Sequence, residues 1–316
     1  MFVADMHCDT ISAIDQERKK GGQAELLSNH FQVDLEKLRQ GGYLLQNFAV
    51  FVDLENGENP YLCAKRQIAV FKEEMAKNKD KIRQVTTVEE IGTNCQEGRI
   101  SALLTLEEGE VCEGNPDKLE DFYRDGVRMM TFTWNYENSL GTKDGLTAKG
   151  IAFLEQMEDL GMLPDVSHLS EAGFYDVWRY SRKPFVASHS NAAALCGHKR
   201  NLSDDMIRKI AERDGVVGVN YYGLFLEEKS RNGIYYSRVE RIADHICHIR
   251  NVGGTACVGL GSDFDGIDTN LELSDCSKMG LLEWELKKRG FRESEIEDVF
   301  YRNVMRIYKE SFKNNA

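Results

Sequence analysis

Short apolar runs alternate with amphipathic segments along most of the chain. The runs have the length and composition of buried strands and comprise residues 2–6, 43–52, 100–106, 127–133, 162–166, 185–188, 216–221 and 257–261. Segments with apolar residues at helical spacing lie between them, at residues 61–78, 146–160, 171–180, 203–213 and 237–250. Strands that alternate with helices predict βαβ units and a parallel sheet. Eight such strands favour an α/β fold closed into a (β/α)8 TIM barrel over an open doubly wound sheet.

The last part of the chain predicts helices beyond the eighth strand. Residues 280–289 have a helical pattern, and residues 293–312 carry one apolar stripe, formed by Ile296, Val299, Phe300, Val304, Ile307 and Tyr308. A single stripe of this kind packs against another element. No Pro- or Ser-rich linker separates this part from the rest. We therefore expect one domain over residues 1–316, with the C-terminal helices, about residues 280–314, packed on the barrel.

Three smaller features have plain structural interpretations. The charged stretch 16–23 (QERKKGGQ) predicts a solvated loop. His245 and His248 lie three residues apart on a predicted helix, and we expect them to be partly exposed rather than to bind a metal. Trp178 and Trp284 lie in helical patterns and are expected in the core or in an interface.

Composition and charge exclude several classes of protein. A hydrophobic fraction of 41% and a charged fraction of 29% are globular values, which exclude a disordered chain. The net charge of −12, with no basic stripe, argues against a nucleic-acid partner. The sequence has no run of eighteen apolar residues and no secretory signal, so we expect no membrane span. Eight scattered cysteines without a Cys-x-x-Cys pair then predict a cytoplasmic protein with reduced thiols.

Histidines and carboxylates follow four of the predicted strands. They are His7 and Asp9 after the first, Glu107 after the third, His168 after the fifth and His189 after the sixth. The carboxyl ends of barrel strands are where active sites are built. Imidazole nitrogens and carboxylate oxygens are the ligands of catalytic zinc and related metals. One such histidine alone is more often structural, but five candidates on the same rim predict a metal site.

Seven motifs, in order and spacing, resemble the membrane (renal) dipeptidase family, the M19 peptidases. They are DMHCDT, LLTLEEG, DVSHLS, PFVASHSNAAAL, KRNLSDD, VGLGSDFDG and YRNVMRIY, and they extend over nearly the whole chain. The resemblance is to a soluble member of bacterial type. It implies an amidohydrolase-like, metal-dependent hydrolase fold with two Zn²⁺ per chain, although zinc, manganese and cobalt are poorly distinguished by such ligands.

The resemblance also implies which residues bind each metal. His7, Asp9 and Glu107 would bind one zinc, and Glu107, His168 and His189 the other, so that Glu107 bridges the two. Glu107 is preferred to Glu108 because it directly follows the strand, whereas Glu108-Gly109 stands where the family has Gly-Gly. Adjacent strand residues point to opposite faces, so only one of the two glutamates can reach the metals.

Two further residues match family positions that act on the substrate. Arg200 matches the arginine that binds the substrate's terminal carboxylate, in keeping with the bidentate geometry of a guanidinium. Asp263 matches the acidic residue that passes a proton from water to the leaving amine. Asp265 lies two positions on, where the same face is available to it, so the choice between them is open.

One position departs from the family pattern. In the stretch MTFTWNYENSLG, Trp134 stands where the family has a histidine that contacts the substrate carbonyl. An indole donates one hydrogen bond but transfers no proton. Asn135, Tyr136 or Asn138 is a candidate for the missing donor.

The resemblance implies a zinc-dependent dipeptidase that attacks the peptide bond with a metal-bridged hydroxide and tolerates a D-residue at the C-terminal position. Its substrate would be a small peptide, and a homodimer is compatible with the family. Because of Trp134, one alternative is a related binuclear amidohydrolase acting on another amide, a lactam or a lactone. A second alternative is a metal-stabilised binding protein without catalysis, against which the intact ligand set argues.

Overall fold

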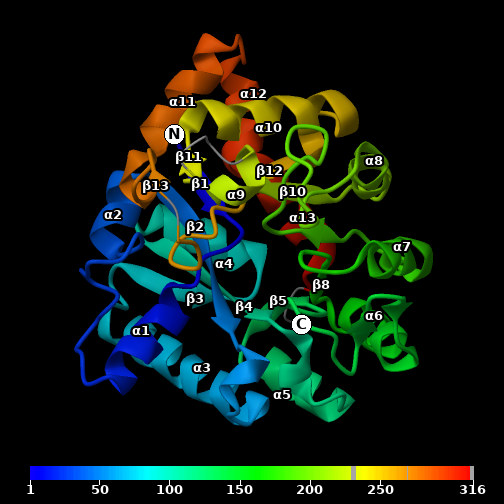
Figure 1. The fold of residues 1–316 in the computed structure, drawn as a ribbon. Coiled ribbons are helices and arrows are strands. Elements are labelled where there is room, and N and C mark those ends of the chain that lie inside the picture. The colour runs from blue at the N-terminus through cyan, green and yellow to red at the C-terminus, as the bar shows by residue number, and fades with distance from the viewer. Residues whose placement is uncertain (229–232, 269, 314–316) are drawn as a thin grey trace.

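A closed barrel of eight parallel strands forms the centre of the molecule (Figure 1). The computed structural model describes residues 1–228, 233–268 and 270–313. The barrel strands are β1 (Val3–Asp5), β2 (Tyr43–Phe51), β4 (Ile100–Glu107), β5 (Val127–Thr131), β8 (Leu163–Asp165), β9 (Val186–Ala187), β10 (Val216–Val219) and β12 (Val258–Leu260). Each pairs with the next in chain order, and the β1–β12 and β2–β4 pairings complete the ring. The prediction of a TIM barrel is confirmed, and the open sheet is excluded.

Strand β3 (Ile82–Val85) is an addition to the ring that the apolar pattern did not predict. It pairs with the first half of β4, from Ile100 to Leu103, while β5 pairs with β4 from Leu104 onward. The eight-residue length of β4 makes both pairings possible. Only the two end residues of β3 are buried, so its pattern is too short to be read as a strand.

Helices surround the barrel, and the five predicted from apolar spacing are all present. They are α3 (Pro60–Lys77), α6 (Ala148–Leu160), α7 (Glu171–Tyr180), α8 (Asp204–Glu212) and α10 (Val239–Gly253). Thr147, Ser170 and Ser203 cap three of them, because each side chain accepts a backbone N–H of the first turn. The others are α1 (Thr10–Lys19), α2 (Leu35–Gln40), α4 (Val88–Gln96), α5 (Pro116–Arg124) and α9 (Gly223–Leu226). Within the described ranges, no helix combines the length and apolarity that crossing a bilayer requires.

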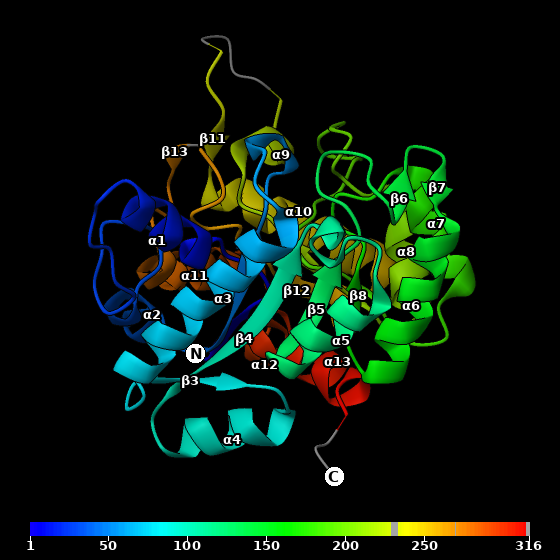
Figure 2. The same cartoon turned by 90° about the horizontal axis from the view of Figure 1, so that it is seen from below.

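The last turns of the C-terminal segment cover the amino ends of the strands, while its first helix packs beside α10. It consists of α11 (Met279–Lys288), α12 (Glu293–Glu297), one π-helical turn (Asp298–Arg302) and α13 (Asn303–Ser311). All six residues of the predicted stripe are buried. Val304, Ile307 and Tyr308 pack in one cluster with strand residues such as Leu45 and Leu103. Figure 2 shows α13 and α4 at one end of the barrel, with α9, β11 (Tyr236–Ser237) and β13 (Asn270–Leu271) at the other.

The structure corrects the prediction of a loop at residues 16–23. Helix α1 continues to Lys19, so only residues 20–23 lie outside it. Ile11 and Ile14 bury one face of this helix, and the charged residues occupy the other, where Arg18 forms an ion pair with buried Glu74. Residues 16–19 therefore lie on the solvent side of a helix, and the predicted loop is confined to residues 20–23.

The prediction for His245 is also wrong, because its side chain is fully buried. Its Nδ1 accepts the backbone N–H of Ala192 at 3.0 Å, and its Nε2 donates to the carbonyl of Leu226 at 3.0 Å. Each ring nitrogen has a fixed role, so the imidazole is held neutral. His248 is half-buried and contacts Asp204 at 2.7 Å. Trp284 is 64% exposed, and the structure places it outside the core.

We predict that His245 makes the fold sensitive to acid. Burial lowers its pKa to about 4, against about 6.5 in an unfolded chain. The unfolded state therefore binds more protons between these values, and stability falls as the pH drops from about 6.5 to 4, by up to about 3 kcal/mol. His245→Gln, which keeps a donor and an acceptor but does not titrate, should flatten part of the dependence of the urea midpoint on pH. The matched variant of exposed His30, His30→Gln, should keep the wild-type slope, and equal slopes in all three proteins would contradict the prediction.

Candidate active site

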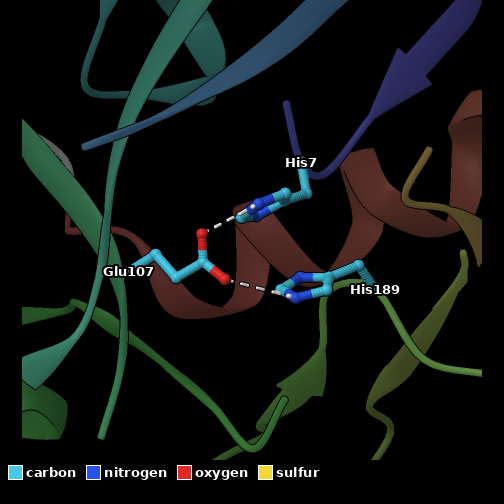
Figure 3. Close-up of side chains that lie close together, drawn as sticks. All are labelled: His7, Glu107 and His189. Carbon is cyan, nitrogen blue, oxygen red and sulfur yellow. Dashed lines mark ion pairs between the residues drawn. The ribbon is translucent and has the colours of Figure 1, made fainter. Parts of the chain in front are cut away.

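The carboxylate of Glu107 lies between three histidines at the carboxyl end of the barrel. Its Oε2 is 3.3 Å from Nε2 of His7, and its Oε1 is 3.0 Å from Nε2 of His168 and 3.6 Å from Nε2 of His189. Figure 3 shows the two oxygens directed toward different imidazoles, His7 on one side and His189 on the other. These residues end or follow strands β1, β4, β8 and β9, so the barrel brings them together from distant parts of the chain.

Two aspartates complete the cluster around His7. The Nε2 atom of His7 is 3.2 Å from Oδ2 of Asp9 and 3.7 Å from Oδ1 of Asp263. A Cβ atom at Gly266 would lie 2.1 Å from Asp9 and 2.7 Å from Asp263, so only glycine allows the backbone to approach both carboxylates. Two sets of three residues have ligand atoms close enough to share an ion: His7, Glu107 and His189, and His7, Asp9 and Asp263.

Hydrogen bonds to Nδ1 direct two imidazoles toward the cluster. Nδ1 of His168 donates to Oδ1 of Asn135 at 3.0 Å. Nδ1 of His189 lies 2.8 Å from Oγ of Ser188, which itself donates to Asp165, so this nitrogen also carries the proton. Both Nε2 atoms are therefore lone-pair acceptors, and they lie 2.8 Å apart beside Glu107. Two acceptor atoms that face one another at this distance suit a bound cation. A hydrogen-bond partner at the other ring nitrogen, here Asn135 or Ser188, is typical of metal-binding histidines.

The charges of the cluster support the same interpretation. Burial lowers the pKa of His168 to about 4 and that of His189 well below its usual value, so both are neutral, as metal ligands must be. Burial and the charge of Glu107 raise the pKa of Asp9 to about 6. Burial, together with the carboxylates of Asp9 and Glu107, raises the pKa of Asp263 to about 8. Although burial lowers it, the charges of Glu107 and Asp9 raise the pKa of His7 well above its usual value, so His7 supplies a positive charge that divalent cations would replace.

The structure separates Asp263 from Asp265. Asp263 faces His7, and its Oδ2 accepts the side-chain amide of Asn220 at 2.8 Å. Both oxygens of Asp265 are engaged elsewhere, because they accept hydrogen bonds from the hydroxyl of Thr10 and from the backbone N–H of Gln32, each at 2.6 Å. Both residues have positive φ, 64° and 68°, so the alternation of a strand does not apply to them. Both residues line the smaller cavity, and of the two carboxylates it is that of Asp263 which lies near His7.

Arg200 lies beside the cluster with free hydrogen-bonding capacity. Its Nη2 donates to the carbonyl of His189 at 3.3 Å, and its buried Nε has no partner. Among the described residues it forms no ion pair with a carboxylate. Arg200 lines two adjoining cavities of about 430 and 540 Å³, and the smaller one contains Asp9, Glu107 and Asp263.

Trp134 and Asn135 form part of the wall that both cavities share with His168 and Arg200. The Trp134 ring lies 4.8 Å from Phe51 and 6.1 Å from His168, measured between ring centroids. Asn135 remains a candidate donor toward a substrate, since only its Oδ1 is engaged by His168.

The other two candidate donors are engaged elsewhere. The amide of Asn138 donates to Glu108 and to the carbonyl of Phe132, which removes it as a donor to a substrate. Tyr136 lines the larger cavity, and its interaction with the Glu55 carboxylate raises the pKa of its hydroxyl.

Sequence reasoning missed four residues that support the predicted ones. They are Ser188 and Asp165 behind His189, Asn220 behind Asp263, and Gly266. Asp165, Ser188 and Asn220 occupy or follow the last positions of barrel strands, which was the available signal. Their contacts, however, are to residues on neighbouring strands and could not be read from one motif.

Comparisons with known proteins agree with this geometry. The model of the membrane dipeptidase family, peptidase family M19, matches residues 1–316. An uncharacterized dipeptidase of Schizosaccharomyces pombe is 32% identical over 308 residues, covering 90% of this chain and 73% of its own length. An uncharacterized protein of Klebsiella pneumoniae is 34% identical, with 77% and 94% covered. The crystal structure of a dipeptidase of metallopeptidase family M19 superposes with a TM-score of 0.90 at 25% identity, over 99% of both chains.

The family match, the relatives and the barrel with its histidine–carboxylate cluster all agree. The chain belongs to the membrane dipeptidase family, peptidase family M19, and is by that membership a metallo-dipeptidase.

Proposed function

We propose that the chain hydrolyses dipeptides at a centre of two zinc ions. The ligands would be His7, Asp9, Glu107, His168 and His189, with Glu107 bridging. One observation carries this proposal. The two oxygens of Glu107 face different histidines: Oε2 lies near His7, and Oε1 lies near His168 and His189. Ligand atoms about 2.0–2.2 Å from a tetrahedral ion lie about 3.3 Å from one another, close to the separations found here. Other divalent metals fit the same donors.

The protein's own residues would position the substrate and move a proton. When bound, the two metals would polarise the peptide carbonyl and lower the pKa of a water molecule to about 7. Arg200 would bind the free carboxylate of the peptide, which limits the substrate to a short one. Asp263, held by Asn220, would accept a proton from water at Oδ1 and donate it to the leaving nitrogen.

The shape and lining of the two cavities would decide which substrates are accepted. Trp134 would contact the substrate as a wall, since its indole transfers no proton. The cavity of about 540 Å³ beyond Arg200 has room for a C-terminal side chain of either hand, so we include D-residues in the proposal. The position of Trp134 also favours one alternative, hydrolysis of another amide, a lactam or a lactone. The single domain over residues 1–316, the cytoplasmic location and the homodimer stay predictions.

We predict amino-acid release from a panel of L-L and L-D dipeptides by the zinc-loaded protein. His168→Ala should reduce turnover to the background, because it removes a proposed ligand. His248→Gln is the matched control, since His248 binds Asp204 away from the cluster, and it should keep wild-type turnover. Folded, metal-loaded protein that cleaves nothing in the panel would exclude the dipeptidase proposal and favour the lactam or lactone alternative.

The two adjacent glutamates should differ in metal binding. Glu107→Gln removes the proposed bridging charge, so the zinc content after dialysis should fall from two per chain to less than one. Glu108→Gln should keep two, because the Glu108 carboxylate faces the backbone N–H of Trp134 instead. Elemental analysis of both variants measures this difference. Equal zinc contents in the two variants would refute the assignment of Glu107.

Arg200→Met should act on the recognition of the free carboxylate. Loss of a charged hydrogen-bond pair is expected to raise KM about tenfold to a hundredfold for a dipeptide acid. The C-terminal amide of the same dipeptide offers no carboxylate, so wild type and variant should treat it alike. Arg200→Lys, which keeps the charge, should retain part of the preference for the acid. A preference unchanged in Arg200→Met would show that the carboxylate binds elsewhere.

A further inference from the structure

We propose that Glu108 is a positioning residue of the active site. Its carboxylate holds the loop of residues 132–140, here called the Trp134 loop, and thereby places Trp134 at the substrate cavities and Asn135 against His168. The loop joins β5 to the short strand β6 (Gly141–Thr142). The link to substrate rests on the proposed function, whereas the link to the loop does not.

The backbone of Glu108 has a conformation that costs energy. Its φ is 102°, a region that residues with a side chain rarely adopt, and the residue is fully buried. Its backbone N–H donates to Oγ1 of Thr131 at 2.9 Å, at the start of the loop. A buried glutamate in such a conformation persists when the surrounding contacts determine its position, and such strain is concentrated at functional sites.

The Glu108 carboxylate accepts three donors, two of them from the loop. Oε2 accepts the backbone N–H of Trp134 at 2.9 Å. Oε1 accepts the backbone N–H of Glu110 at 2.8 Å and the side-chain amide of Asn138. Hydrogen bonds to a charged acceptor are roughly twice as strong as neutral ones. Glu108 therefore fixes the loop at two points four residues apart.

Asn138 extends this contact through the loop. Its Oδ1 accepts the backbone N–H groups of Leu140 and Gly141, at 2.8 and 2.9 Å, and its amide donates to the carbonyl of Phe132 at 2.8 Å. The amide that Glu108 binds is therefore the one that closes the loop on itself.

The residues next to Glu108 bring the two segments into direct contact. Oε2 of Glu110 accepts the backbone N–H of Ser139 at 2.7 Å. A Cβ atom at Gly109 would lie 2.6 Å from the carbonyl oxygen of Phe132, so this approach requires glycine. The turn 108–110 and the Trp134 loop thus pack as one unit.

The far side of the loop faces the site. Oδ1 of Asn135 accepts the Nδ1 proton of His168 at 3.0 Å, which directs Nε2 of that imidazole toward Glu107. Trp134 lines both cavities together with Asn135. Glu108 therefore acts on the substrate and on His168 through the loop, without contacting either.

The test uses Trp134 as its own reporter. In the Trp178→Phe/Trp284→Phe background it is the single tryptophan of the chain. Glu108→Gln keeps the size and the strained backbone but replaces one acceptor oxygen with an NH2 group, which then faces the donor or donors of that oxygen. Glu108→Gly removes both carboxylate and strain. We expect both changes to increase acrylamide quenching of Trp134 while two zinc ions stay bound. In the protein with all three tryptophans, kcat/KM for the best dipeptide should fall about tenfold.

Glu113→Gly is the matched control. Glu113 also has positive φ, at 51°, but it is exposed and its carboxylate contacts Lys118 and Asn59 instead of the loop. It should leave both readouts at wild-type values. Should Glu108→Gly fail to fold, Glu108→Gln decides the question alone.

The outcomes separate the two proposals. Quenching unchanged in the Glu108 variants, or equally increased in Glu113→Gly, would overturn the positioning role. Increased quenching with unchanged kcat/KM would overturn its link to catalysis. If the wild type cleaves no dipeptide, the proposed function fails, and quenching still decides whether Glu108 holds the loop.

Discussion

The site depends on a cluster of buried acceptor atoms around the Glu107 carboxylate. Glu107 is surrounded by imidazole nitrogens, two of which carry lone pairs toward it, and the carboxylates of Asp9 and Asp263 lie close by. Buried acceptors and charges of this kind are costly unless a positive charge joins them. Divalent cations would remove this cost. The barrel brings the ends of β1, β4, β8 and β9 close enough for these side chains to meet around Glu107.

A second layer of residues gives each acceptor its direction. Ser188 and Asp165 orient His189, Asn135 orients His168, and Asn220 orients Asp263. The backbone is strained at the same places, with φ of 69° at His168 and 64° at Asp263. Strain that is maintained by surrounding contacts is a mark of a site whose geometry matters to function. The strained backbone conformations thus occur at two residues of the cluster around Glu107 and His7.

The Trp134 loop lines the substrate cavities, while the barrel strands hold the histidine–carboxylate cluster. Strand ends hold the ligands rigidly, while the loops beyond them vary and line the cavities. In this chain the Trp134 loop is fastened from β4 by Glu108 and Glu110 and reaches His168 through Asn135. The loop that places Trp134 at the cavities therefore also contacts His168 directly.

The sequence by itself determined the eight barrel strands, the main helices and the five candidate ligands. Each of these follows from local patterns: apolar runs, helical spacing, and polar residues directly after a strand. Local patterns did not show the short strand β3, the helical part of residues 16–19 or the burial of His245, because burial depends on segments far away in the chain. Only the tertiary structure showed that Asp263 and Asp265 have different partners. Their side-chain directions are set by positive φ angles and by partners such as Thr10, 255 residues distant. The partners of Glu108 could not be predicted from the sequence either. The apolar pattern predicts which face of a strand a residue lies on, but it does not predict which distant donors its side chain contacts.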